Sequence, residues 1–260
     1  MQAASLPVSA GWFWIHAGYA LFRRQPLAMF TWAITIGLLV LLASLLVPLG
    51  PAIFILLMPA VSVMTLNACR DIEAGKTVRP LLLWQLLRQP GMARRLFGLG
   101  GIYLLGVIAV GILGFLPFYG NLEAAAQLAE AQNDLLPLFE AVRGPLILSG
   151  LLYLLLAALF WHAPVLVAWH GMGMRKALFF SGIACWRNKG AFVVYGLAWA
   201  GLVAIFEMLA YLLQSIGLPG GVVSLVQMPL SFVLAAVLYC SFYPTYTTVF
   251  GDPDAPAAQA

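Results

Sequence analysis

Charged side chains are scarce in this chain of 260 residues: only 8% are Asp, Glu, Lys or Arg, while 63% are hydrophobic. A soluble domain carries about 25% charged residues, so the composition excludes a surface that faces water on all sides. Apolar stretches of about 20 residues recur, each long enough to cross a hydrocarbon layer about 30 Å thick. Since no stretch alternates like a barrel strand, the sequence predicts an all-α membrane protein, a polytopic helical bundle.

Cysteine is also rare. Cys69, Cys185 and Cys240 include no C-x-x-C pair, and all three fall near span ends that the charge distribution places on the cytoplasmic side. Reduced thiols are therefore expected, and neither a metal site nor a cofactor is predicted.

Motifs of catalysis are missing as well. The sequence contains no phosphate-binding loop, dinucleotide fingerprint or G-x-S-x-G nucleophile elbow. His162 and His170 are eight positions apart (170 − 162), whereas metal ligands on one helical turn lie three or four apart. Asp71 and Glu73 share a predicted loop with basic residues, which is typical of a solvated, self-paired turn. The protein is therefore not expected to be an enzyme.

Six spans are predicted, and the basic residues set their direction. Of the 13 Lys and Arg residues, all but Arg143 fall before the first span or in the second and fourth connections. Positively charged loops stay in the cytoplasm, so both termini are expected inside, as an even number of spans requires. The basic residues are thus explained by topology, and no nucleic acid partner is predicted. The spans cover 27–47, 51–69, 96–118, 145–169, 191–216 and 222–246.

A cleaved signal at FRRQPLAMF (22–30) is the alternative for the N-terminal region. A signal peptide carries its positive charge at the front and has a shorter apolar region. Here more than twenty residues precede Arg23 and Arg24, so a retained first span is favoured.

The connection 119–144 is the longest on the opposite side. Asn121 and Asp134 are candidate N-caps of two short helices. The second would rest on the outer membrane surface, although a solvated loop with some helix is an equal alternative. One face of this second helix would carry Leu135, Leu138, Phe139 and Val142.

Three stretches, 9–26, 79–91 and 173–190, are amphipathic and each ends in a basic cluster. In the first, Trp12, Ile15, Tyr19 and Phe22 follow helical spacing and form an aromatic stripe. Such helices lie in the interface, with Trp and Tyr at headgroup depth. The sequence therefore predicts three interfacial amphipathic helices, each followed by two crossings.

The chain thus forms one membrane domain, 1–250, with a short disordered cytoplasmic tail at 251–260. Within it we distinguish three modules, 8–69, 79–169 and 174–246. Modules of one orientation differ from the inverted repeats used in alternating access, so duplication of an insertion unit is favoured over a repeat-built transporter.

The interfacial stretches predict a cytoplasmic surface that contacts anionic lipid headgroups or other membrane proteins. Its basic and aromatic members are Trp12, Arg23, Arg24, Trp84, Arg94, Arg95, Arg175, Lys176, Trp186 and Arg187.

Three segments, GWFWIHAGYALFRRQP, LNACRDIEAGKTVRP and APVLVAWHGMGMRKALFFSGIACWRNKGAFVVYG, resemble a family of proteobacterial integral membrane proteins of unknown function. The likeness covers most of the chain except 119–144. It implies the inner membrane of a Gram-negative bacterium, and it brings no known activity or site residue.

Glu207 is the single acid within the predicted spans. On a helical wheel it falls on the face of Gly196, Ala200, Ala204 and Tyr211, opposite bulky aliphatic residues, so it is predicted to face the bundle. An ionised carboxylate at mid-membrane costs about 3 kcal/mol or more, and no Lys or Arg lies in a predicted span, so a protonated acid is expected.

Counting outward from the turn near Pro219 predicts a candidate intramembrane polar site of Glu207, Tyr211, Gln227 and Ser231. This site leaves two functions open. A neutral glutamic acid that joins helices fits a non-catalytic accessory or scaffold protein. An acid that exchanges its proton fits a small proton- or cation-coupled carrier with a midplane site around Glu207. The lack of a second buried acid favours the first.

Overall fold

The structure is a computed structural model that describes residues 3–252, in which helices are joined by short connections without a strand. Most of the predicted tail, 253–260, lies outside the described residues. In chain order the elements, with η for 3-10 helices, are α1 (Ala10–Arg24), α2 (Pro26–Leu45), α3 (Leu49–Glu73), η1 (Pro80–Arg88), α4 (Met92–Phe115), η2 (Leu116–Phe118), α5 (Tyr119–Gln132), α6 (Leu136–Phe160), α7 (Ala163–His170), α8 (Met174–Arg187), α9 (Lys189–Ser215) and α10 (Gly220–Phe250).

Six helical stretches are long and apolar enough to cross a membrane, which confirms the all-α class and the predicted number. The fourth is interrupted at Trp161 and His162, where α6 ends and α7 begins. Pro164 lies in the first turn of α7, and its missing N–H cannot continue the ladder of α6. The six stretches are Pro26–Leu45, Leu49–Glu73, Met92–Gln132, Leu136–His170, Lys189–Ser215 and Gly220–Phe250.

The connection 119–144 differs from the expectation of a surface helix or a loop. Asn121 is not an N-cap, because α5 already begins at Tyr119. Asp134 is not the N-cap of the next helix either, because that position is Leu135, but its Oδ1 accepts a hydrogen bond from the N–H of Leu136, the first helical residue, at 3.0 Å. That helix is α6 itself, which continues without a break into the span and packs along α5. The segment therefore lengthens the α4–α6 pair.

The helices α1, η1 and α8 occupy the three stretches predicted to be interfacial. The aromatic stripe expected on α1 is divided, however. Ile15 and Phe22 are buried, whereas Trp12 and Tyr19 are each 50% exposed. The reason is that α1 packs against α10 and α9 and turns its Trp14 face inward, which buries Ile15 and Phe22 of the stripe.

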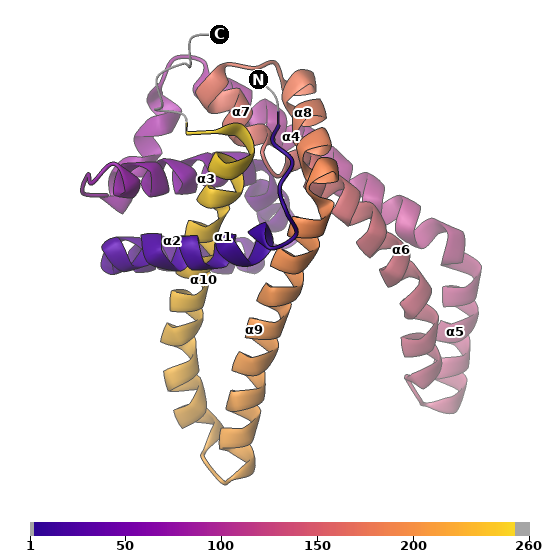
Figure 1. Ribbon diagram of the computed structural model, residues 1–260. Coiled ribbons are helices and arrows are strands. Elements are labelled where there is room, and N and C mark those ends of the chain that lie inside the picture. Colours follow the sequence, from indigo (N-terminus) through magenta and orange to yellow (C-terminus); the bar gives the residue numbers. More distant parts are fainter. Residues whose placement is uncertain (1–2, 253–260) are drawn as a thin grey trace.

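The buried core lies at the end of the molecule where the basic residues gather. Buried side chains of α2 lie in its first half, and those of α3 and α10 lie mostly in the second half. The halves that lead to the turns near 47, 134 and 217 are largely exposed. In Figure 1 the α9–α10 pair and the α4–α6 pair diverge from the packed end. The exposed halves are apolar, so lipid is the solvent that suits them.

Two glycines bring α1 close to its neighbours. A Cβ at Gly11 would lie 2.2 Å from the carbonyl oxygen of Ala191 in α9, and a Cβ at Gly18 would lie 2.5 Å from the Cα of Ser241 in α10. Both neighbouring atoms are backbone atoms, which cannot rotate away. Small residues at such crossings are typical of packed membrane helices.

The segment before α1 joins the first module to the last. The N–H of Ala4 donates a hydrogen bond to the carbonyl oxygen of Val249 at 2.8 Å. Asn188, between α8 and α9, is 1% exposed. Its Oδ1 accepts a hydrogen bond from the N–H of Leu6 at 2.8 Å, and its Nδ2 donates to the carbonyls of Ala4 and Ala184, each at 2.9 Å. One side chain thus holds a segment 182 positions away in sequence.

Gln25, between α1 and α2, makes a similar clamp. Its Nε2 donates to the carbonyl oxygen of Lys76 at 2.6 Å, and its Oε1 accepts from the N–H of Val78 at 2.9 Å. Gln25 and Asn188 each follow an interfacial helix, and each holds the segment that leads to another one. That the modules descend from one repeated unit stays a prediction.

Candidate functional site

The predicted cytoplasmic surface lies at the packed end of the molecule. Nine of its ten residues are exposed on α1, α4 and α8. Trp84, on η1, is the exception, because it is half-buried with its ring 6.2 Å from that of Trp32 in an edge-to-face contact. The basic side chains are therefore free to reach headgroups, while the aromatic residues differ in exposure.

Cations of this surface and its neighbour Lys189 lie over aromatic rings. Lys189 Nζ is 4.5 Å from the ring centre of Trp186, and the Arg23 guanidinium is 5.9 Å from that of Tyr19. Trp186 is 68% exposed. Aromatic rings beside Lys and Arg are the usual anchors of a helix at the membrane–water boundary.

A polar hollow of about 450 Å³ opens at the same end. The Arg70 guanidinium is 5.2 Å from the ring centre of Trp169, and Lys76 Nζ is 3.7 Å from Asp71 Oδ1. The Lys76 side chain is 71% exposed. The hollow combines cationic and amide groups with one acid, and its lining is Asn67, Arg70, Asp71, Ala74, Lys76, Leu86, Gln89, Met92, Ala168 and Trp169.

The predicted polar site around Glu207 is present only in part. Gln227 Nε2 donates a hydrogen bond to Glu207 Oε2 at 3.1 Å, which links α9 to α10. Ser231 donates instead to the carbonyl oxygen of Gln227, one turn earlier in its own helix, at 2.9 Å. Tyr211 is 71% exposed and lies outside the pair. The structure thus brings two of the four residues together through their side chains.

The helical wheel predicted that Glu207 points into the packed part of the molecule, but the structure does not place it there. Its side chain is exposed on the outer half of α9. The buried side of α9 carries Tyr195, Trp199 and Ala210. The wheel assumed that the face with small and polar residues would be the packed one, whereas the bulky aromatic face supplies the contact.

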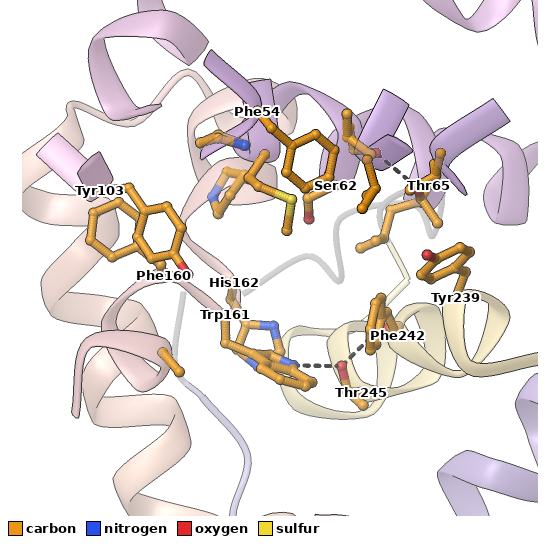
Figure 2. A pocket seen from close by; sticks show the side chains of 18 of the residues that line it. Phe54, Ser62, Thr65, Tyr103, Phe160, Trp161, His162, Tyr239, Phe242 and Thr245 are labelled. Carbon is orange, nitrogen blue, oxygen red and sulfur yellow. Dashed lines mark hydrogen bonds between the residues drawn. The ribbon is translucent and has the colours of Figure 1, made fainter. Parts of the chain in front are cut away.

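A cavity that the sequence did not predict lies where the hairpins meet. Its volume is about 440 Å³, and Figure 2 shows side chains of α3, α4, α6 and α10 around it. No charged residue contributes to the lining. The lining residues are Ile36, Val40, Phe54, Met58, Pro59, Val61, Ser62, Thr65, Leu66, Tyr103, Tyr153, Ala157, Phe160, Trp161, His162, Pro164, Tyr239, Phe242 and Thr245.

His162 stands at the buried side of this cavity. It is 1% exposed, and its Nε2 has no hydrogen-bond partner among the described residues. Its backbone N–H donates to Ser181 Oγ at 3.0 Å, which fixes α7 against α8. The ring centre of Phe250 is 5.2 Å from that of the imidazole. The local sequence marks this position only by a His-x-Pro junction at the end of an apolar run. The residues that surround His162 are distant in sequence, so the cavity could not be predicted from it.

Comparison with known proteins places the chain in a family. A protein of Burkholderia thailandensis named "Probable inner membrane protein" is 41% identical over 266 positions, which cover 98% of this chain and 97% of the relative. The chain belongs to the family of this inner membrane protein. No family model matches the sequence, and no solved structure matches the chain.

The family and the six apolar helices agree with the expected resemblance to proteobacterial membrane proteins. The chain is a multi-pass inner membrane protein. Among residues 3–252, no three His, Cys, Asp or Glu side chains are grouped so that they could hold a metal ion.

Proposed function

We propose that the protein is a non-catalytic accessory or scaffold protein whose cytoplasmic surface binds anionic lipid headgroups. The observation that carries the proposal is the gathering of exposed basic residues at the packed end, away from the turns of the three hairpins. A rigid core beneath a cationic surface suits docking, because its side chains are presented on fixed helices. Other membrane proteins with acidic segments are a second kind of partner for this surface.

Headgroup binding is tested in nanodiscs that contain phosphatidylcholine and a small share of phosphatidylglycerol. A variant with Arg23, Arg24, Lys176 and Arg187 all replaced by Gln is expected to lose enrichment of the anionic lipid, measured by mass spectrometry of co-purified lipid. Each basic residue near a charged surface contributes about 1 kcal/mol, so the combined loss is expected to exceed tenfold.

Arg143→Gln is the matched control, because Arg143 is an exposed cation on α6 at the opposite side. It is expected to leave the enrichment unchanged. Equal enrichment in the quadruple variant and in the wild type would remove the basis of the proposal.

We further propose that both termini and the basic surface lie in the cytoplasm. The natural cysteines Cys69, Cys185 and Cys240 are all buried, and burial raises the pKa of the Cys185 thiol to about 12. A thiol reacts as its thiolate, and a raised pKa leaves Cys185 protonated at every pH well below 12. The natural cysteines are therefore expected to give little background with a water-soluble maleimide at pH 7.

Two exposed positions then report the topology. Glu130→Cys, near the α5–α6 turn, is expected to react with an impermeant maleimide in intact spheroplasts. Arg175→Cys, on α8, is expected to react only after permeabilisation. The reverse pattern would place the basic surface in the periplasm and contradict the proposal.

A proton- or cation-coupled carrier is the second candidate, because Glu207 is the single acid within the predicted spans and its side chain is exposed. In proteoliposomes with a pH-sensitive dye inside, a carrier would give a proton flux that Glu207→Ala abolishes. For the scaffold we expect the same low flux from the wild type and from the variant. A proton flux that depends on Glu207 would support the carrier function and contradict the scaffold function.

A further inference from the structure

The cavity between the hairpins has the character of a site for an apolar ligand. Its volume of about 440 Å³ falls in the range of about 300–1,000 Å³ that is usual for small-molecule sites. Its 19 lining residues include no Asp, Glu, Lys or Arg. An ionised group would lose its hydration there without a counter-charge, so the chemistry of the wall selects an uncharged occupant.

The cavity leads from an exposed rim to a buried floor. At the rim, Val40 on α2 and Tyr153 on α6 are each 46% exposed, and Met58 on α3 is 37% exposed. At the floor, Thr65 and His162 are 3% and 1% exposed. The rim residues belong to the spans, so the entrance faces the hydrocarbon of the bilayer.

Most polar groups of the wall already have partners. Trp32 Nε1 donates to Thr65 Oγ1 at 2.9 Å, and Trp161 Nε1 donates to Thr245 Oγ1 at 3.1 Å. Both hydroxyls then donate to carbonyls of their own helices. These groups shape the wall and have little capacity left for a ligand.

Three polar side chains of the wall have no side-chain hydrogen bond within residues 3–252. They are Ser62 on α3, Tyr239 on α10, and His162 between α6 and α7, whose buried Nε2 has no partner. Each comes from a different hairpin, and in Figure 2 the hydroxyls of Ser62 and Tyr239 point toward the open centre. A few convergent polar groups in an apolar, aromatic wall are typical of a site that fixes one end of a hydrophobic ligand.

We propose that this cavity binds an uncharged membrane lipid that has a long hydrocarbon chain and a small oxygen-containing head. The hydrocarbon chain of this lipid enters from the bilayer past Val40 and Tyr153. The head accepts or donates hydrogen bonds at Ser62 and Tyr239, on the side of the cavity nearer the packed end. This site is separate from the cationic surface, which takes charged headgroups from outside the core, so the two proposals can fail independently.

The test uses a fatty alcohol that carries a photoreactive diazirine on its chain, added to the purified protein in detergent. After irradiation, mass spectrometry of the peptides is expected to find the label on 54–66 and 153–164, and unlabelled fatty alcohol is expected to displace it. A quaternary ammonium amphiphile with the same labelled chain is expected to give at least tenfold less label there, because its charge cannot enter.

Ala157→Trp on α6 fills the cavity and is expected to reduce the labelling at least tenfold. Ala200→Trp is the control, because Ala200 is exposed on α9 and does not line the cavity. If Ala157→Trp is not monodisperse, Val40→Trp at the exposed rim blocks the same entrance with less demand on packing. Labelling that is unchanged in the folded blocking variant, or spread evenly over the exposed halves of the spans, would show bulk contact only and overturn the proposal.

Discussion

Gly18→Ala is expected to lower the stability of the folded protein, although the same change on an exposed helix raises it. The new Cβ would lie 2.5 Å from the Cα of Ser241, so α1 and α10 would have to separate along their most extensive contact. Overpacking of this kind typically costs about 1–3 kcal/mol, and a displaced backbone raises the cost further. We expect a lower midpoint of thermal unfolding in detergent, followed by tryptophan fluorescence, and little monodisperse protein from Gly18→Val.

Gly111→Ala is the matched control, because Gly111 also lies inside a helix, in α4, and a Cβ there would meet nothing within 4 Å. Alanine is favoured over glycine in a helix by about 1 kcal/mol, so Gly111→Ala is expected to keep or raise the midpoint. Both changes replace glycine by alanine, so opposite shifts of the unfolding midpoint would report the close contact between α1 and α10. A Gly18→Ala midpoint at or above that of the wild type would contradict the close approach of α1 and α10.

Asn188→Ala is expected to destabilise the folded protein strongly, because Asn188 is a buried polar side chain. The change removes three hydrogen bonds and leaves the N–H of Leu6 and the carbonyl of Ala4 without their partner. A buried polar group without a partner costs about 1–3 kcal/mol. We therefore expect a loss of roughly 3 kcal/mol in the free energy of unfolding, measured by denaturant titration.

The same substitution at Asn121, exposed inside α5, serves as the control and is expected to change stability little. Asn188→Ala should also release the segment that precedes α1, so limited proteolysis is expected to cleave between residues 3 and 9 sooner than in the wild type. Unchanged cleavage and unchanged stability together would show that the segment is held by other contacts.

The number of spans and the three interfacial helices could be predicted because they depend on local properties. An apolar run of sufficient length crosses a membrane wherever it stands in the chain, and basic clusters mark the ends of such runs. Counting from the short turn at Pro219 also grouped Glu207 with Gln227, but it placed Glu207 level with Ser231. In the structure Gln227 donates to Glu207 instead.

The packed faces of the helices were harder to predict. On α9 the expected inner face included Glu207, yet its side chain is exposed. On α1 the packed face includes Trp14, which the predicted aromatic stripe left out. A wheel assigns a face from composition, whereas the true face is selected by the neighbour that the tertiary structure supplies. In a membrane, helices can pack through faces of bulky residues or of small ones, so the composition of a face says little about whether it is packed or faces lipid.

The clamp at Asn188 and the cavity beside His162 could not be predicted from local patterns. Asn188 contacts the carbonyl of Ala4, 184 positions earlier in the chain. The cavity wall combines residues from α2 to α10, and none of them belongs to a recognisable motif. Such sites follow from the way in which the hairpins assemble, which no single stretch of sequence encodes.

The meeting of Ala4 with Val249 has a consequence for biosynthesis. The first interfacial helix leaves the ribosome early, but it rests on α9 and α10, which are made after all the other described helices. Until α10 is made, the indole N–H of Trp14 lacks Thr248, and Gly18 lacks Ser241, against which it packs. The translocon can insert each hairpin in turn, while the final assembly awaits completion of the chain. Nascent proteins cut short before α10 should accordingly be substrates for membrane quality-control proteases.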